Sequence, residues 1–297
     1  MLRQLAISFL AALALTQAAL AQDFSKVEIK THKLSDTLYM LVGAGGNLGV
    51  SIGDDAVFVI DDQYAPLVPK IQAAIAALSP KPVRFVLNTH FHGDHTGGNE
   101  ALGQAGALIV AHDNVRRRMN SEQFISFVSA RVPPSPKAAL PVVTVPGEIR
   151  FHLNGDEIHA FHVPRAHTDG DLIVHFSKGD VVHMGDVYFR GMYPFIDTSS
   201  GGTADGVIAA ADRVLAMSTD KTRIIPGHGP LASKADLQAY RDMLATVTQR
   251  IKTLRRDGKS DEQIRAAAPS ADFDAAWGGG FIKPERFVQM MLDAVPR

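Results

Sequence analysis

Four side chains that can bind a metal lie within six residues of one another: His90, His92, Asp94 and His95. They directly follow the apolar run Val83–Leu87, which predicts a buried strand. Imidazole is a favoured ligand of zinc and related ions, and carboxylate joins it readily. In a plain surface loop, histidines this close together would repel one another when protonated and would gain nothing from burial when neutral. We therefore interpret this segment as the beginning of a metal site.

Three further residues of ligand type occur later in the chain: His167, Asp186 and His228. Each lies where a predicted strand gives way to a turn, which is where functional groups on a rigid scaffold usually occur. Taken singly, Asp186 is equally well explained as a turn former and His228 as a loop histidine. Together with the first cluster, the three residues form a coherent set of ligands.

The elements that must position these residues alternate between strand-like and helical patterns. Strands are predicted over Lys26–Lys30, Leu38–Val42, Leu48–Ile52, Ala56–Ile60, Val83–Leu87, Ala107–Ala111, Glu148–Leu153, Glu157–Val163, Asp171–Phe176, Asp180–Met184 and Arg223–Pro226. Helices are predicted over Pro66–Leu78, Gly98–Leu102, residues 113–130, Ala204–Met217, Asp236–Leu254 and Lys283–Leu292. This order indicates two similar halves, with helices outside a pair of sheets.

One segment near the middle of the chain divides these two halves. Arg131–Gly147 contains five prolines. Such a segment is explained either as an interdomain linker or as a long loop over one face of a single domain.

The N-terminus predicts a secretory signal peptide over residues 1–21. Arg3 supplies positive charge, Leu5–Leu15 is apolar apart from one serine, and Ala19–Ala21 matches the small-residue pattern that precedes cleavage. The apolar stretch is shorter than the ~20 residues of a membrane-spanning helix, so no stable membrane anchor is expected after cleavage following Ala21. We therefore expect a periplasmic or secreted protein.

Composition narrows the classes of partner and the ligand chemistry. Apolar residues make up 46% of the 297 residues and charged residues 21%, which allows a substantial core. The formal net charge of −1 provides no field for nucleic acid or an anionic membrane, so the expected partner is a small-molecule substrate. With no cysteine, the chain has no disulfides and every metal ligand must be nitrogen or oxygen. The oligomeric state stays open.

The motif THFHGDH, followed in order by AHTDGD, HMGD and PGHG, resembles the metallo-β-lactamase superfamily. The resemblance covers nearly the whole mature chain. It implies an α+β fold, a four-layer αββα sandwich of two mixed sheets flanked by helices. Residues 22–297 would form one such domain, with a C-terminal helical extension from about residue 232 and the site at one edge of the sheets.

The resemblance also implies a role for each ligand. His90, His92 and His167 would hold one metal, Asp94, His95 and His228 the second, and Asp186 would bridge the two. The family places an aspartate at the end of an earlier strand, where it supports a ligand histidine. Asp61 matches that position, and Asp62 is the less favoured substitute. Such a carboxylate fixes the tautomer of its imidazole and raises its basicity.

The chemistry follows from two cations held close together. Divalent ions ~3.5–4 Å apart can hold a shared water as hydroxide near neutral pH, and this hydroxide attacks a carbonyl carbon. Asp94, with a free carboxylate oxygen, is the expected catalytic residue, which orients the nucleophile or carries a proton to the leaving group. Two zinc ions suit the ligands best, with manganese or iron as compatible metals.

The expected function is therefore an exported dinuclear hydrolase acting on a lactam, lactone, ester or thioester. One alternative is a true β-lactamase. An alternative of another class is a non-catalytic periplasmic protein that binds a metal or a ligand.

The residues after Asp186 bear on the substrate. In antibiotic-hydrolysing members with a cysteine at this position, a lysine three residues on holds the substrate carboxylate, whereas this chain has Phe189. The bridging aspartate looks more like thioesterases of the glyoxalase II type, although export argues against a cytosolic thioester. We expect a mostly apolar pocket, with Arg131–Gly147 as its opposite wall or lid. The expected near wall consists of Arg190, Met192, Tyr193 and Phe195.

Overall fold

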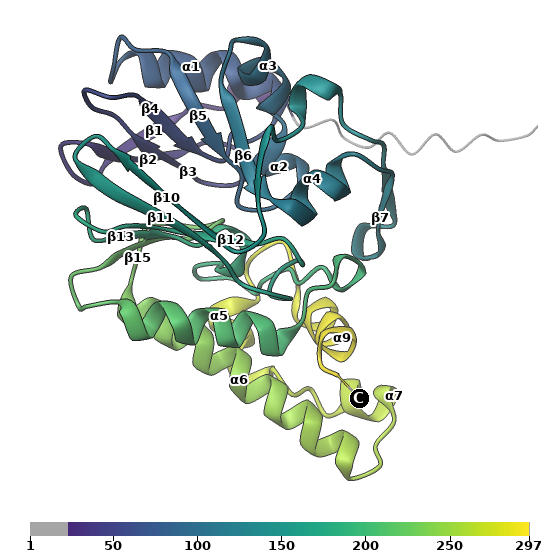
Figure 1. The fold of residues 1–297 in the computed structure, drawn as a ribbon. Helices are drawn as coiled ribbons and strands as arrows, with labels where there is room; N and C mark the ends of the chain where they lie inside the picture. Colours follow the sequence, from purple (N-terminus) through teal and green to yellow (C-terminus); the bar gives the residue numbers. More distant parts are fainter. Residues whose placement is uncertain (1–22, 297) are drawn as a thin grey trace, which may run out of the picture.

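Two β-sheets lie face to face in residues 23–296, the part of the chain that this computed structural model describes (Figure 1). Helices cover the outer side of each sheet, so the layers follow the order helix, sheet, sheet, helix. The αββα sandwich expected from the sequence is therefore confirmed. The predicted signal peptide lies outside the described residues.

The first sheet is formed by the N-terminal half of the chain. Its strand order is β1 (Lys30–Lys33), β2 (Leu38–Val42), β3 (Leu48–Ser51), β4 (Val57–Ile60), β5 (Val83–Leu87), β6 (Leu108–His112) and β9 (Val143–Val145). Neighbouring strands are antiparallel from β1 to β4 and parallel from β4 to β9.

The second sheet comes from the C-terminal half. Its order is β10 (Glu148–Leu153), β11 (Asp156–His162), β12 (Leu172–Phe176), β13 (Val181–His183), β14 (Arg223–Ile225) and β15 (Ala232–Ser233). The strands pair antiparallel except for β13 and β14, which run parallel.

The helices complete the two outer layers. Helices α1 and α3 cover the first sheet, and α5 and α6 cover the second (Figure 1). Their bounds are α1 (Val68–Ala76), α2 (Gly93–Thr96), α3 (Asn99–Gln104), α4 (Asp113–Met119), α5 (Ala204–Met217), α6 (Lys234–Arg256), α7 (Asp261–Ala266), α8 (Asp274–Trp277) and α9 (Pro284–Ala294). Within the described part of the chain, no helix is both long and apolar enough to cross a membrane.

Strand β4 shows why an uninterrupted apolar run is needed in this fold. Phe58 and Ile60 belong to the core between the sheets, whereas Val57 and Val59 belong to the core beneath α1. Successive side chains of a strand point to opposite faces, and here both faces are buried. Packing on both faces therefore fixes the position of the carboxyl end of this central strand.

Two elements differ from the sequence predictions. The first strand begins at Lys30, after a short 3-10 turn at Phe24–Lys26, instead of spanning Lys26–Lys30. The helix predicted over residues 113–130 ends at Met119, and the chain continues into the hairpin of β7 (Gln123–Ile125) and β8 (Ala130–Val132). Four of the five residues from Phe124 to Val128 are apolar, the exception being Ser126, and such a run suits a strand as well as a helix.

The last part of the proline-rich segment Arg131–Gly147 belongs to the first sheet. Its residues Val143–Val145 form β9, which pairs in parallel with β6. The segment therefore continues the sheet and is not a free linker.

Candidate metal centre

The ligand residues lie at the carboxyl ends of two parallel strand pairs, one in each sheet. In the first sheet, β4 is followed by Asp61 and β5 by the histidine cluster. In the second sheet, β13 is followed by Asp186 and β14 by His228. The loop between β11 and β12 supplies His167. Side chains that follow parallel strands meet at one edge, so the two sheets together form one site.

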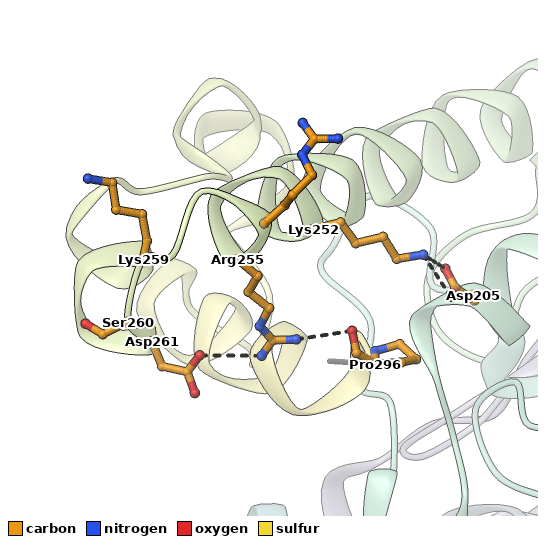
Figure 2. A pocket seen from close by; sticks show the side chains of 8 residues that line it. Asp205, Lys252, Arg255, Lys259, Ser260, Asp261 and Pro296 are labelled. Carbon is orange, nitrogen blue, oxygen red and sulfur yellow. Dashed lines mark hydrogen bonds and ion pairs between the residues drawn. The ribbon is translucent and has the colours of Figure 1, made fainter.

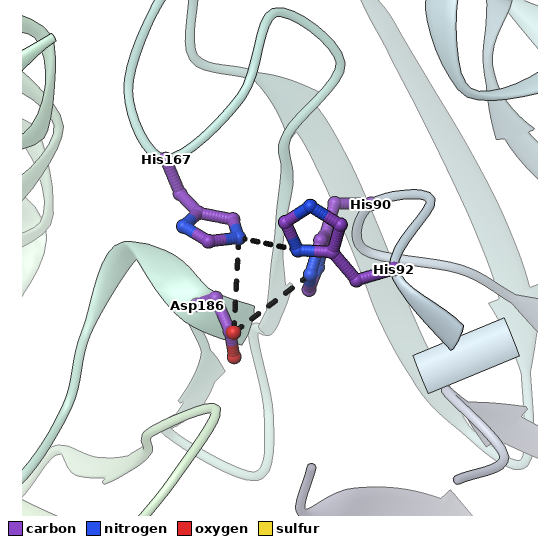
Figure 3. Close-up of side chains that lie close together, drawn as sticks. All are labelled: His90, His92, His167 and Asp186. Atoms are coloured by element: carbon purple, nitrogen blue, oxygen red, sulfur yellow. Dashed lines mark hydrogen bonds and ion pairs between the residues drawn. The ribbon is translucent and has the colours of Figure 1, made fainter. Parts of the chain in front are cut away.

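The first donor group is completely inside the protein. His90, His92, His167 and Asp186 each offer an atom within 4.8 Å of the others, and all four residues are buried. Their side chains point toward one common centre (Figure 3). His92 Nδ1 and His167 Nε2 lie 3.0 Å apart across it.

The second donor group lies beside the first and is partly open to solvent. It consists of Asp94, His95 and His228. Asp94 Oδ2 lies 3.2 Å from His228 Nε2 and 3.6 Å from His95 Nε2. The side chains of Asp94 and His228 are 20% and 22% exposed, whereas His95 is fully buried. A substrate would therefore approach from the side of Asp94 and His228.

Asp186 connects the two groups with its two carboxylate oxygens. Oδ2 lies 3.8 Å from His90 Nε2 and 3.7 Å from His167 Nε2. Oδ1 lies 3.0 Å from His95 Nε2 and 3.3 Å from His228 Nε2. Each oxygen thus faces one donor group, which is the arrangement of a bridging carboxylate.

Asp61 and Thr89 determine which ring nitrogen faces the site in two of the histidines. His95 Nδ1 donates to Asp61 Oδ2 at 2.8 Å, which leaves a lone pair on Nε2. The Thr89 hydroxyl donates to the same Asp61 oxygen at 2.8 Å, so it accepts from His90 Nδ1 at 3.1 Å. His90 Nε2 therefore also presents a lone pair to the site. Asp62, the less favoured alternative to Asp61, instead accepts a hydrogen bond from the backbone of Gly98.

The other two histidines of the first group, His92 and His167, also present a lone pair to the site. His167 Nδ1 donates to the carbonyl of Phe195 at 2.8 Å, and His92 Nε2 donates to Asp197 Oδ2 at 3.1 Å. Their remaining nitrogens are then two lone pairs that face each other at 3.0 Å. Such a contact is repulsive unless a proton or a metal ion lies between the two atoms, so the geometry fits a cation.

Further observations agree with two cation sites. Within residues 23–296, the buried atoms His90 Nε2 and Asp186 Oδ1 lack a hydrogen-bond partner. Burial holds the pKa of His90 well below its usual range and lowers that of His167 to about 4, which keeps both rings neutral, as ligands must be. Burial opposes protonation of His228 too, but Asp186 and Asp94 outweigh it and raise its pKa to about 9. The second group therefore attracts positive charge. All seven predicted ligands come together, and the two donor groups are compatible with two metals.

The close packing at Asp186 depends on a glycine. A Cβ atom on Gly227 would lie 2.0 Å from Asp186 Oδ1 and 2.6 Å from the backbone carbon of Gly185. The backbone N–H of Gly227 also donates to the Gly185 carbonyl at 2.7 Å. The loop that carries His228 is thereby held against the loop that carries Asp186.

The residues predicted to form the near wall of the pocket do not all face the site. Phe195 does, because its ring stacks on His92 at a centroid distance of 5.7 Å. Met192 is partly buried and packs against the core of the second half. Tyr193 has no exposed area and stacks on Phe287 in that core, so its prediction as a wall residue was wrong.

Arg190 is directed away from the donor groups. Its guanidinium donates to the Leu231 carbonyl and to Asp236 Oδ1, the latter at 3.1 Å. Asp236 in turn caps the first turn of α6 through Ser233. Arg190 thus fastens α6, and its predicted place in the substrate pocket was wrong.

Sequence reasoning missed Asp197, Thr89 and Phe189. Asp197 accepts from His92, Thr89 links Asp61 to His90, and the buried ring of Phe189 lies parallel to that of His228 at 5.1 Å. Thr89 is adjacent to a ligand, which is a signal that the motif itself carries. Asp197 lies 105 residues from His92 and has no such local signal.

A cavity of about 890 Å³ lies elsewhere, at the C-terminal end of α6 (Figure 2). None of the metal-binding candidates lines it. Its side chains Lys252 and Arg255 pair with Asp205 and Asp261, respectively. We therefore assign the chemistry to the donor groups at the sheet edge.

Comparison with known proteins identifies the family. A family model described as the metallo-beta-lactamase superfamily matches residues 49–228. The chain belongs to the metallo-beta-lactamase superfamily. The family resemblance found in its motifs is thereby confirmed.

Relatives of the chain are named hydroxyacylglutathione hydrolases. A hydroxyacylglutathione hydrolase of Polaromonas sp. is 25% identical over 226 residues, which cover 69% of this chain and 76% of that protein. A hydroxyacylglutathione hydrolase of Nitrosococcus oceani is 29% identical over 144 residues, 48% of this chain and 47% of that protein. The chain thus spans about half the length of the latter relative.

Solved structures share the fold. A metallo-beta-lactamase from Pontibacter korlensis superposes with a TM-score of 0.59 at 16% identity, covering 73% of this chain and 99% of that chain. A double mutant of a sec-alkyl sulfatase gives a TM-score of 0.67 at 17% identity and covers 89% of this chain and 49% of that chain. At these identities the likeness shows the fold alone.

Proposed function

We propose that the chain is an exported dinuclear metal-dependent hydrolase that cleaves a small-molecule ester, lactone, lactam or thioester. The observation that carries this proposal is the position of Asp186, whose two oxygens each face a separate group of nitrogen and oxygen donors. A closed structural site would not need an exposed carboxylate such as that of Asp94. We propose zinc as the metal, because every donor is imidazole or carboxylate.

Two divalent ions bound here would polarise a carbonyl group and lower the pKa of water, so that hydroxide would be available to attack the carbonyl near neutral pH. The residues of the chain supply position and proton transfer. Asp94 is partly exposed, and its Oδ2 faces His95 and His228 in the second donor group, so its other carboxylate oxygen would be free to accept a proton from the attacking water and deliver it to the leaving group. His95 and His228 hold pKa values above the usual histidine range, mainly because Asp186 outweighs burial, so the site tolerates added positive charge.

A thioester is one supported substrate class, because the relatives that match the chain are named hydroxyacylglutathione hydrolases. Hydrolysis of β-lactams stays as the second candidate, because a structural neighbour is named a metallo-beta-lactamase. Phe189 occupies the position of the lysine that holds the substrate carboxylate in antibiotic-hydrolysing members with a cysteine, and the guanidinium of the neighbouring Arg190 donates to Asp236. This disfavours the β-lactamase alternative relative to uncharged carbonyl substrates.

Export is proposed from the composition of the first 21 residues, with Arg3, Leu5–Leu15 and Ala19–Ala21 in the order of a signal peptide. Expression of the full chain in a bacterial host, followed by mass spectrometry of the periplasmic fraction, tests this point. The proposal requires a product that begins at Gln22.

The activity test combines metal analysis with a substrate panel. The purified protein should contain two equivalents of metal and hydrolyse at least one of a thioester, a lactone, an aryl ester and a chromogenic cephalosporin. A chelator should abolish turnover, and Asp94→Ala should lower kcat by about 10²-fold or more. Asp205→Ala, which removes a surface carboxylate paired with Lys252, is the matched control and should leave turnover intact. Bound metal without metal-dependent hydrolysis of any reporter would favour the non-catalytic alternative.

A further inference from the structure

Two series of ring contacts lead from the metal ligands to the protein surface. The first begins at His228, on which the buried ring of Phe189 stacks with 17° between the ring planes. Phe281 contacts Phe189 at a centroid distance of 6.3 Å, and 62% of Phe281 is exposed. Phe281 is thus a largely exposed aromatic ring, and a single ring, that of Phe189, separates it from the ligand residue His228 of the open donor group.

The second series begins at His92, on which Phe195 stacks with 20° between the planes. Phe127 contacts Phe195 at a centroid distance of 4.8 Å. The guanidinium of Arg286 lies over the Phe127 ring at 4.2 Å and donates to the Phe127 carbonyl. Phe127 is thus held in position, even though it belongs to the exposed hairpin between α4 and β9.

The exposure of Phe281 is a fixed property of its loop. The backbone N–H of Tyr193 donates to the Trp277 carbonyl at 2.9 Å, which attaches this loop to the segment after Asp186. A Cβ atom on Gly280 would lie 2.7 Å from the Cβ of Met192, so only glycine allows the two backbones to approach this closely. Phe281 follows directly and is directed outward from an anchored loop.

The hairpin adds more exposed apolar area next to Phe127. Phe124 is 51% exposed, Val128 57% and Val132 38%. Large apolar side chains that cluster at a functional site and stay uncovered usually serve to bind something. A groove of about 320 Å³ also borders Phe127, and its lining combines the apolar Phe127, Ile196 and Met290 with the charged Asp197, Arg286 and Asp293.

We propose that Phe281 and Phe127 bind the apolar part of the substrate, an acyl chain attached to the carbonyl that is cleaved, and thereby select medium-length acyl esters, lactones or thioesters over those with a charged acyl part. This inference rests on the proposed hydrolase function. Both rings are connected to metal ligands through a single intervening ring. Neither residue belongs to the ligand set.

The test uses para-nitrophenyl esters with acetyl, butyryl, hexanoyl, octanoyl and decanoyl groups, plus a succinyl ester as the charged acyl part. For the metal-loaded wild type we expect kcat/KM to rise with chain length, by roughly tenfold or more between butyryl and octanoyl, since each buried methylene contributes to binding. Phe281→Ala and Phe127→Ala should each flatten this rise. Leu108→Ala is the control, because Leu108 is also an exposed apolar residue but lies at the amino end of β6, whereas the metal ligands lie at the carboxyl ends of the strands. This variant should keep the full rise.

A second measurement separates binding from chemistry. Calorimetry with octanamide, which is not cleaved on this timescale, should give weaker binding to Phe281→Ala than to wild type, in both metal-loaded and metal-stripped protein. Metal-dependent hydrolysis with an identical chain-length profile in all variants, or a preference for the succinyl ester, would overturn this inference but leave the hydrolase proposal intact. Failure of metal-dependent hydrolysis with the whole panel would instead reject the proposed function.

Discussion

Asp61 links the two ends of the histidine cluster, because one of its oxygens accepts from His95 Nδ1 at 2.8 Å and the other from the Thr89 backbone at 2.7 Å. The residue is fully buried and has a positive φ of 58°, a conformation that Asp and Asn tolerate better than other residues with side chains. Its charge therefore sets the tautomer of one ligand directly, and that of His90 through the Thr89 hydroxyl.

Asp61→Asn should lower metal affinity by about 10–100-fold, because the amide can no longer accept from both His95 and Thr89 with the charge of a carboxylate. Asparagine keeps the backbone conformation, so the effect reports the carboxylate. Competition titration with a chelator measures it.

Asp62→Asn is the matched control for this substitution. Burial holds the pKa of Asp62 well above its usual range. Its Oδ1 accepts a hydrogen bond from the Gly98 backbone, and within residues 23–296 its buried Oδ2 has no hydrogen-bond partner. Asparagine resembles the protonated acid in shape, so metal affinity should stay near the wild-type value. An equal loss in both variants would show that Asp61 has no specific role toward His95.

Gly227→Ala should displace Asp186, because the added Cβ would lie 2.0 Å from Asp186 Oδ1. We expect a loss of about 1–3 kcal/mol in the free energy of unfolding and less than two equivalents of bound metal. Denaturant unfolding and metal analysis check the two effects. Gly93→Ala is the control, since nothing lies within 4 Å of a Cβ there, and should retain both metals.

The stability of the metal-stripped protein should fall as pH rises from about 6.5 to 9. Asp186 and Asp94 outweigh burial and raise the pKa of His228 to about 9, whereas an unfolded histidine titrates near 6.5. A group with a raised folded pKa stabilises the fold fully below its unfolded pKa, and this contribution disappears as pH passes through the folded pKa. Thermal unfolding of the chelator-treated protein at a series of pH values measures this decline in stability.

His167 acts in the opposite direction at lower pH. Burial lowers its pKa to about 4, so its contribution is present above pH 6.5 and is lost as pH falls toward 4. The metal-stripped protein should therefore be most stable near neutral pH. Bound metal displaces the proton of His228, so metal affinity should increase with pH over the window in which stripped protein loses stability. A stripped protein whose melting temperature is flat between pH 6.5 and 9 would contradict this assignment.

Arg190→Ala should destabilise the fold and leave substrate binding unchanged. The guanidinium connects the segment after Asp186 with Asp236 at the start of α6 and with the Leu231 carbonyl. Because the ion pair is partly exposed, we expect a loss of about 1 kcal/mol. Urea unfolding measures the change in the free energy of unfolding, and KM for the hydrolysed substrate shows whether substrate binding changes. A large rise in KM for carboxylate-bearing substrates would restore Arg190 to the pocket.

The metal ligands could be predicted from the sequence because each one follows a strand that local patterning reveals. The apolar run Val83–Leu87 indicated a buried strand, and the residues after it occur where parallel strands end. The same local logic found His228 after β14, whereas Asp61 after β4 was indicated by the family resemblance.

The surroundings of the site depend on packing between distant segments, which no local pattern encodes. Asp197 reaches His92 across 105 residues, and Phe281 reaches Phe189 through a loop outside the family match. The aromatic content of the segment Arg190–Phe195 indicated a pocket, but only Phe195 stacks on a ligand, and Tyr193 fills the core. Side-chain type alone does not distinguish an inner from an outer face in a segment without regular periodicity.

The two sheets contribute unequal halves of one coordination set: His90, His92, Asp94 and His95 from the first, and His167, Asp186 and His228 from the second. A cation held in common would act as a cross-link between two regions that are continuous in the chain only through the segment before β10. The metal-bound protein should therefore unfold in a single transition at a higher temperature than the metal-stripped protein. In the metal-stripped protein, one region would unfold before the other. Metal supply would then govern how long the protein lasts as well as what it catalyses.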